Sequence, residues 1–234
     1  MARLRRLYAP GVPQLLRVDL ARPLAAAHEP APAERLDLIH HWLGLEVRRQ
    51  AAALHGWVLL PTGIALLATP ATPQSLPAVV QGLGRRMAAR LVHGRVFQER
   101  YRATLVDEAW VPLCLTWLES LPVRQGLVDQ PARWPWSSAQ DHVGLRLEAG
   151  LLTDHAAYWE LGNTPFARQA HHQTALQTGV GESERLRIEQ ALQGQWALGN
   201  NEFLERVASR SSRRVAPAPR GRPRKKPPEE KVTK

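Results

Sequence analysis

Histidine and tyrosine are the residue types in this chain that could hold a metal ion or attack a phosphate ester. The histidines considered for such chemistry are His40, His41, His55, His93, His142, His155, His171 and His172. His40 and His41 are adjacent on a predicted helix, so their side chains diverge, and most of the others are isolated in the sequence. We therefore expect these histidines to face solvent or to lie at the edge of the core, and we predict no metal site.

Tyr101 and Cys114 are the other candidates for covalent chemistry. Tyr101 lies in the predicted strand "QERYRA", where an aromatic residue is ordinary sheet packing, so we do not expect it to be a nucleophile. Cys114 is the single cysteine, which excludes an internal disulfide framework and a cysteine-based zinc cluster.

The positive charge of the chain is concentrated near one end. The net charge is +10, and residues 206–234 contain eleven Lys/Arg and two Asp/Glu, so the preceding residues are close to neutral. This segment is rich in proline, serine and like charges and has few residues that could form a core. We predict that it is a disordered basic tail when free.

The segment "PRGRPRKK" within this tail resembles an AT-hook. Pro223 favours an extended backbone, Gly221 permits close approach, and Arg220 and Arg222 can enter the narrow minor groove of A·T-rich DNA. Its flanking basic residues are Arg224, Lys225 and Lys226. The alternative is a tail that only increases solubility or binds polyanions in general.

The elements ahead of the tail follow a readable order. Their expected ranges are a strand around "VPQLLRVDL", a helix over residues 33–54, the hairpin "WVLLPTGIALLATP", a helix capped by Ser75, a strand in "RVFQERYRATLVD", a helix over residues 108–121 closed by Pro122, and a helix over residues 181–198. This order predicts an α+β fold of the ferredoxin-like, split βαβ type, with an antiparallel sheet and helices on one face.

Composition sets the class of protein. With 234 residues and 44% hydrophobic content, the chain can bury one sizeable core. Its apolar stretches fall short of the roughly 20 residues that a membrane-spanning helix needs, and "MARLRRLYAP" lacks the apolar region of a signal peptide. We expect a cytoplasmic, nucleoid-associated protein with no membrane partner.

Several collinear segments carry a family resemblance. They are "RLYAPGVPQ", "WVLLPTGIALLATP", "LGRRM", "VFQERYRATLVD", "WLESLPVRQGLV", "WPWSSAQDHVG" and "QWALGNNEF". Through them the chain resembles the REP-associated tyrosine transposases, single-tyrosine members of the HUH nuclease superfamily, over residues 3–205. His171 and His172 lie outside the matching segments.

The resemblance implies a catalytic apparatus that this chain lacks. The family's hairpin carries two histidines that hold Mg²⁺ or Mn²⁺ against the scissile phosphate, and here those positions are Gly63 and Ala65, which have no ligand atom. The position of the family's nucleophilic tyrosine is Trp117, whose indole is a donor without an oxygen. The family's asparagine is replaced by Leu121, whereas Glu119, Pro122 and Arg124 remain. These replacements predict no cofactor and no strand cleavage.

Basic residues in the body are the remaining DNA-binding candidates. By resemblance, hairpin DNA of the repetitive element would contact Arg85, Arg86, Arg100, Arg102 and Arg124. The alternative is a solvated basic rim. Trp134 and Trp136 in "WPWSS" are expected to pack against the sheet rather than to stack on bases.

The resulting hypothesis is a transposase-like protein that binds hairpin or A·T-rich DNA without cutting it. We expect a transposase-like domain over residues 1–130, a helical extension over 131–205 and the basic tail over 206–234, in a monomer or homodimer. Two alternatives stay open: an active strand-transferase that uses unrecognised residues, and a non-catalytic subunit that partners an intact relative.

Overall fold

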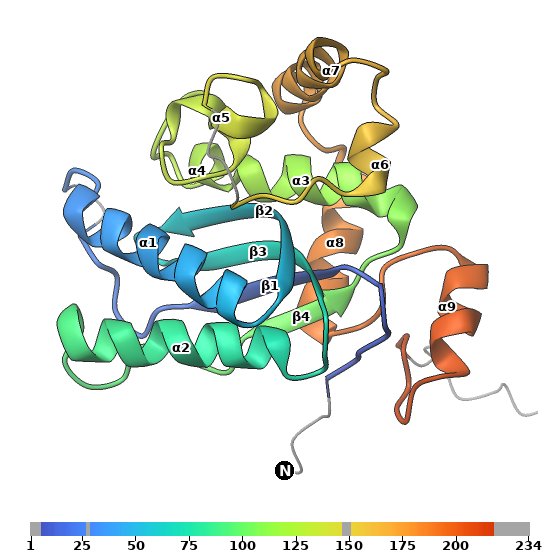
Figure 1. The fold of residues 1–234 in the computed structure, drawn as a ribbon, viewed down its shortest axis with the longest axis horizontal. Helices are drawn as coiled ribbons and strands as arrows, with labels where there is room; N and C mark the ends of the chain where they lie inside the picture. Colours follow the sequence, from blue (N-terminus) through green and yellow to red (C-terminus); the bar gives the residue numbers. More distant parts are fainter. Residues whose placement is uncertain (1–5, 27–28, 147–150, 218–234) are drawn as a thin grey trace, which may run out of the picture.

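A four-stranded antiparallel sheet forms the centre of the structure, a computed structural model that describes residues 6–26, 29–146 and 151–217 (Figure 1). Its strands are β1 (Gln14–Asp19), β2 (Ala52–Leu60), β3 (Gly63–Pro70) and β4 (Arg102–Leu105). Their order is β2-β3-β1-β4, and every neighbouring pair is antiparallel. This is the order of a ferredoxin-like split βαβ fold, so the predicted architecture of the sheet is confirmed.

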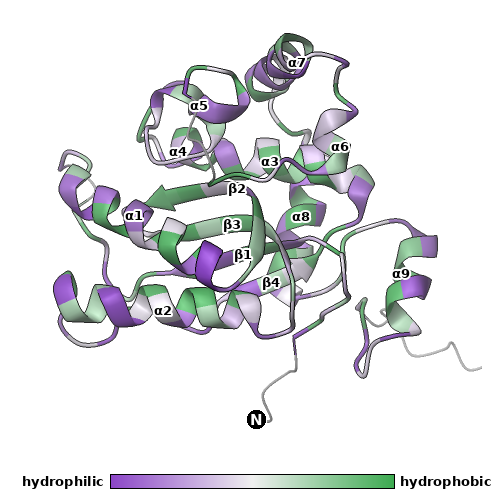
Figure 2. Cartoon of the chain, viewed as in Figure 1, coloured by the Kyte–Doolittle hydropathy of each residue, from purple (hydrophilic) through white to green (hydrophobic). Residues whose placement is uncertain are grey.

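Helices cover both faces of the sheet, whereas the sequence predicted one. Helices α1 (Ala33–Arg49) and α2 (Ser75–Arg90) lie in front of the sheet in Figure 1, and α3 (Val111–Glu119) and α8 (Glu182–Gly194) lie behind it. On β2, the ring of Trp57 stacks on His40 of α1 with 4.4 Å between centroids. A Cβ added at the neighbouring Gly56 would meet Leu115 of α3. Adjacent residues of β2 therefore face different helices, which is why the strand is buried on both sides. Figure 2 shows that most of this strand is hydrophobic.

Several predicted boundaries shift for local reasons. The first helix ends at Arg49 instead of continuing to residue 54, because Ala51 has a positive φ of 49° and the chain then enters β2. Gln74, rather than Ser75, is the N-cap of α2; the Ser75 hydroxyl instead accepts a hydrogen bond from the backbone N–H of Thr72.

The predicted helix over residues 108–121 is three short pieces. They are the 3₁₀ helix η1 (Glu108–Trp110), α3, and α4 (Leu121–Arg124). Pro122 lies in the first turn of α4, where its missing N–H costs nothing, so it begins this helix instead of closing the previous one.

The region after residue 130 is largely helical, as predicted in outline. Its elements are η2 (Pro131–Arg133), α5 (Ala139–His142), α6 (Ala156–Trp159), α7 (Pro165–Thr178), α8 and α9 (Asn201–Ala208). Of these only α8 was predicted, and it ends at Gly194 instead of residue 198. None of the described helices is both long and apolar enough to cross a membrane.

Residues 206–217 are part of the folded body, although the sequence assigned them to the tail. Arg206 lies in α9, and Val207 and Val215 are buried in a small second core with Leu7, Leu105 and Phe203. The backbone N–H of Ala197 donates to Val215 at 2.8 Å and holds this segment in place. The AT-hook-like residues lie in 218–234, outside the described residues.

The "WPWSS" segment packs along the edge strand β2. The backbone N–H of Leu59 donates to Trp136, that of Ser138 donates to Trp57, and the indole of Trp134 donates to Leu59 at 2.9 Å. The prediction that these tryptophans pack against the sheet is confirmed. The segment also protects the backbone groups that an edge strand would otherwise expose.

Candidate functional site

The β2–β3 hairpin is the place where the resemblance puts metal ligands. Ala65 pairs with Val58 of β2 and is 1% exposed. Val58 lies two residues from Gly56, so Ala65 is on the face that α3 covers. At the turn, the Thr62 hydroxyl donates to the side chain of Gln125, just after α4. The hairpin and the segment after α4 therefore meet.

Gly63 has no room for a larger side chain. A Cβ at this position would lie 2.6 Å from the carbonyl oxygen of Val18 and 3.2 Å from Cα of Asp19. Both atoms belong to the backbone of β1, so the sheet itself would have to shift. Neither Gly63 nor Ala65 has a side chain with a ligand atom.

Trp117, at the position where the resemblance places a nucleophilic tyrosine, is buried with Ala65 in one core cluster. Its indole N–H donates to Oε1 of Glu189 at 3.5 Å, and Arg124 donates to the same oxygen at 2.6 Å. Arg185 donates to the other oxygen of Glu189 at 3.1 Å. A pocket of about 520 Å³ borders Trp117, Arg124 and Arg185. The charged side chains around Glu189 are paired, and the indole of Trp117 offers no oxygen that could attack a phosphate.

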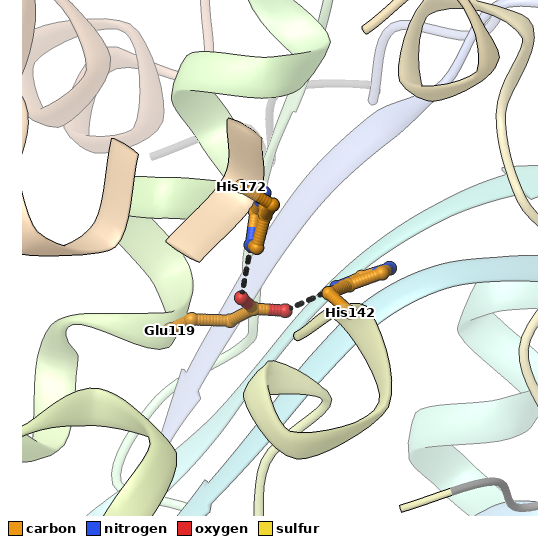
Figure 3. A group of neighbouring side chains, drawn as sticks. All are labelled: Glu119, His142 and His172. Atoms are coloured by element: carbon orange, nitrogen blue, oxygen red, sulfur yellow. Dashed lines mark hydrogen bonds and ion pairs between the residues drawn. The ribbon is translucent and has the colours of Figure 1, made fainter. Parts of the chain in front are cut away.

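Glu119, two residues beyond Trp117, is the centre of a buried polar cluster (Figure 3). Oε1 of Glu119 lies 2.6 Å from Nδ1 of His142 and accepts a hydrogen bond from the Ser138 hydroxyl at 2.5 Å. Oε2 lies 2.7 Å from Nε2 of His172. The phenol of Tyr158 donates to the backbone oxygen of His142. Helices α3, α5 and α7 are thus joined through one carboxylate.

The electrostatics of this cluster are those of an ion pair sealed from water. Burial by itself opposes ionisation of Glu119, but His142 and His172 outweigh it and lower the pKa of the carboxyl. Burial likewise opposes protonation of His142, but the charge of Glu119 outweighs it and raises the pKa of that imidazole. The cluster therefore favours a carboxylate beside a protonated His142.

The expectation that the histidines lie at the surface or core edge is wrong for His142 and His172. Both are buried, at 2% and 1% exposure, and both bond Glu119. The ligand atoms of the three residues lie within 4.8 Å of one another, so the group could hold a metal ion if the ion replaced the shared protons. It has no exposed face on which a substrate could bind, since Glu119 is 0% exposed.

His55 is also more enclosed than predicted. Its ring nitrogens bond the backbone oxygen of Thr153 at 2.6 Å and the Thr69 hydroxyl at 2.8 Å, and its ring contacts His155. Burial lowers the pKa of His55 to about 4, so this imidazole is neutral at physiological pH. Its role is to satisfy buried polar groups.

Tyr101 is buried, and the guanidinium of Arg6 lies 3.5 Å from its ring centroid. Burial raises the pKa of the Tyr101 phenol to about 12. A phenol that resists ionisation and faces the interior is a poor nucleophile, in keeping with its interpretation as a packing residue.

The five arginines predicted to contact DNA are dispersed. Three of them form ion pairs: Arg86 with Glu46 at 2.9 Å, Arg102 with Glu99 at 3.3 Å, and Arg124 with Glu189 at 2.6 Å. Arg85 is exposed on α2, and Arg100 lies ahead of β4 at the mouth of a second pocket. Their contact with DNA stays a prediction.

Sequence reasoning missed the Glu119 cluster because its members come from three separate segments. Glu119 belongs to the matching motif, but His142 follows it by 23 residues and His172 by 53. His172 lies on α7, a helix that was not predicted. The sequence signal for α7 was the pair Thr164-Pro165, which is typical of a helix start. In the structure the Thr164 side chain accepts a hydrogen bond from the N–H of Ala167.

The fold of this chain has a counterpart among solved structures. No family model matches the chain, and no curated protein does. Among solved structures, a REP-associated tyrosine transposase determined bound to a REP hairpin matches with a TM-score of 0.50 and 19% identity, over 67% of this chain and 96% of that one. The resemblance found in the sequence is thereby confirmed at the level of the fold: this chain has the fold of a REP-associated tyrosine transposase.

Proposed function

We propose that this protein binds hairpin or repeat DNA and does not cleave it. The observation that carries the proposal is the fold match to a transposase solved on a REP hairpin. The β2–β3 hairpin and the segment after α4 meet through the Thr62–Gln125 hydrogen bond, which supports a DNA-binding surface at this place.

Three residues support the loss of strand cleavage. Gly63 and Ala65 provide no metal ligand, and Trp117 provides no nucleophilic oxygen. The backbone of β1 leaves no space for a side chain at position 63. Enzymatic cleavage and joining of DNA strands depends on both a nucleophile and a charge-stabilising group at the same phosphate. We infer that neither is provided here.

The alternative is an active strand-transferase built from other residues, and one observation favours it. Glu119, His142 and His172 have the composition of a catalytic metal site. Against this role, their polar atoms bond one another, and the group is buried beneath α3, α5 and α7. A DNA phosphate would need these helices to separate before it could reach the cluster.

The basic tail extends the proposal to duplex DNA. Arg220 and Arg222 flank Gly221 in the AT-hook-like segment, and arginines in an extended backbone favour the narrow minor groove of A·T-rich sequences. Arg224, Lys225 and Lys226 add charge that any duplex would attract. A protein with these two contacts would be associated with the nucleoid.

Fluorescence anisotropy tests the binding. Full-length protein is titrated into a labelled DNA hairpin, an unstructured single strand of the same length and composition, and an A·T-rich duplex, all at one salt concentration. We expect the hairpin to bind at least about tenfold more tightly than the unstructured strand, the difference that a few shape-dependent contacts produce. Equal binding of hairpin and unstructured strand would contradict hairpin recognition.

A further inference from the structure

A second pocket is built from four parts of the chain that are distant in sequence. It has a volume of about 420 Å³ and is lined by the N-terminal segment, the start of α2, Arg100 ahead of β4, and the segment after α9. Its lining includes Arg6, Tyr8, Gln74, Arg100, Arg210, Ser211 and Arg213. The second core holds the N-terminal segment and the segment after α9 in place, because it buries Leu7 of the first and Val215 of the second.

All the charged side chains that line this pocket, called the arginine pocket below, are positive. Four arginines line it, and no aspartate or glutamate is among its lining residues. A neighbouring pocket, by contrast, contains Asp19 and Glu99 beside its arginines. Within the described part of the chain, no carboxylate pairs with Arg6 or Arg213. Arg6 and Arg213 thus bring positive charge to the pocket without a carboxylate partner among the described residues.

Unsatisfied donors mark the same place. Nε of Arg6, Nε of Arg213 and Oγ of Ser211 are buried and have no hydrogen-bond partner. Buried polar groups are nearly always paired, and an unpaired one costs about 1–3 kcal/mol. Burial also lowers the pKa of Arg6 to about 10 and lowers that of Arg213. An anion in the pocket would satisfy these donors and compensate the buried charge.

The geometry favours a group with several acceptor oxygens. The guanidinium of Arg6 is fixed in plane by its stacking on Tyr101. Gln74, the N-cap of the 16-residue helix α2, lines the pocket, so the positive end of this helix borders it. The terminal nitrogens of Arg213 donate to the carbonyl oxygens of Gln195 and Arg214, which leaves its Nε as the donor for a ligand. Charged guanidinium donors of this kind suit the oxygens of phosphate.

We propose that the arginine pocket binds a phosphate group of a nucleic-acid strand. The volume is larger than phosphate alone requires and is in the range of small-molecule sites, so a whole nucleotide unit fits. The assignment of this phosphate to a nucleic-acid strand rests on the proposed function, whereas phosphate binding by the pocket does not. Free phosphate would use the same donors.

Four proteins test this inference: wild type, Arg6→Gln, Arg213→Gln and the matched control Arg90→Gln. Arg90 is exposed at the opposite end of α2, so its substitution removes the same charge away from the pocket. Melting temperatures are measured with increasing inorganic phosphate at constant ionic strength, and anisotropy is measured with a labelled single strand. Circular dichroism checks the fold of each variant, and Ser211→Ala serves as a neutral variant if an arginine substitution unfolds the protein.

We expect phosphate to raise the melting temperature of wild type and Arg90→Gln, and this rise to be lost in both pocket variants. The pocket variants should bind the strand about tenfold more weakly, the effect of one charged hydrogen bond, and Arg90→Gln within about twofold of wild type. Equal losses in all three variants, or no phosphate effect on wild type, would overturn the pocket. If the phosphate-induced rise is lost only in the pocket variants but wild type binds no DNA, the pocket stands with free phosphate as its ligand, and the proposed function is contradicted instead.

Discussion

Trp117 and Glu119 lie two residues apart on α3, and their surroundings differ in kind. Around Trp117 the hairpin is apolar, with Gly63 and Ala65 where the resemblance places metal ligands. Around Glu119, two histidines and a serine share one buried carboxylate. The composition of a metal site is present in this protein, but on the side of the helix where the resemblance predicts no chemistry.

The difference teaches that a polar cluster and a catalytic site have separate requirements. A catalytic site needs an approach for its substrate, whereas the Glu119 cluster is closed and joins three helices. We interpret this cluster as the structural link between α3 and the later helices α5 and α7.

The largest expected effect comes from removing the shared carboxylate. Glu119→Ala leaves His142, His172 and Ser138 without their common partner, and breaking a buried ion pair costs about 3–5 kcal/mol. Urea denaturation followed by circular dichroism measures the free energy of unfolding. Glu99→Ala is the control, because Glu99 forms an exposed pair with Arg102 and should cost less than about 1 kcal/mol. Equal effects of the two variants would show that the buried cluster has no structural role.

The pH dependence of stability separates two buried histidines. The pKa of His55 is lowered from its ordinary 6.5 to about 4, so between these values the unfolded chain binds more protons and the free energy of unfolding falls as the pH decreases, by about 2–3 kcal/mol. The lowered pKa of Glu119 extends this loss below pH 4.5. The raised pKa of His142 acts in the opposite sense, and its stabilisation is lost as the pH rises above 6.5.

Urea denaturation over a pH series checks these signs. His55→Gln should flatten the acid side of the stability curve, and His142→Gln should flatten the alkaline side. Each variant serves as the control for the other. An alkaline side that His142→Gln leaves unchanged would disprove the ion pair with Glu119.

A substitution that crowds the β2–β3 hairpin tests whether the region around Trp117 has room for a ligand side chain. Gly63→Ala places a methyl group 2.6 Å from the carbonyl oxygen of Val18, and we expect a loss of about 1–3 kcal/mol by urea denaturation. Gly44→Ala is the matched control. Gly44 lies within helix α1, and a Cβ there would meet only side-chain atoms, none closer than 3.4 Å, so this variant should raise the free energy of unfolding by up to about 1 kcal/mol. A neutral Gly63→Ala would show that the hairpin has room for a ligand side chain.

The smallest effect concerns the salt dependence of DNA binding. If four to six tail residues contact phosphates, log K should fall with log salt at a slope of roughly −4 to −5 on duplex DNA. Deletion after Pro217 removes the AT-hook-like segment and keeps the buried Val215, so the slope should flatten while the fold remains. Arg222→Ala should selectively weaken binding to A·T-rich duplex. An unchanged slope after the deletion would show that the phosphate contacts are made by residues ahead of the deleted segment.

The sheet could be predicted from sequence because its signals are local. Alternating and apolar runs separated by Pro61-Thr62-Gly63 specify the hairpin, and the helical spacing of Leu36, Ile39 and Leu43 specifies α1. The second layer, over the other face of the sheet, was missed. Strands buried on both sides show continuous apolar runs, and the sequence of β3 was not interpreted in this way.

The polar cluster and the arginine pocket could not be predicted, because both join segments far apart in the chain. His172 has no local pattern that points to Glu119, and Arg6 has none that points to Arg213. The burial that gives these groups their properties arises only when the C-terminal helices pack on α3 and the last described segment packs against the N-terminus.

Cleavage is the most direct test of the central claim that this fold binds DNA without cutting it. Wild-type protein is incubated with end-labelled hairpin DNA and Mg²⁺ or Mn²⁺, and the products are separated on a denaturing gel next to the Gly63→His, Ala65→His, Trp117→Tyr triple variant. We predict intact DNA and no covalent protein–DNA adduct for wild type, and also for the triple variant, because the β1 backbone blocks position 63. A metal-dependent nick with an adduct in wild type would contradict the account.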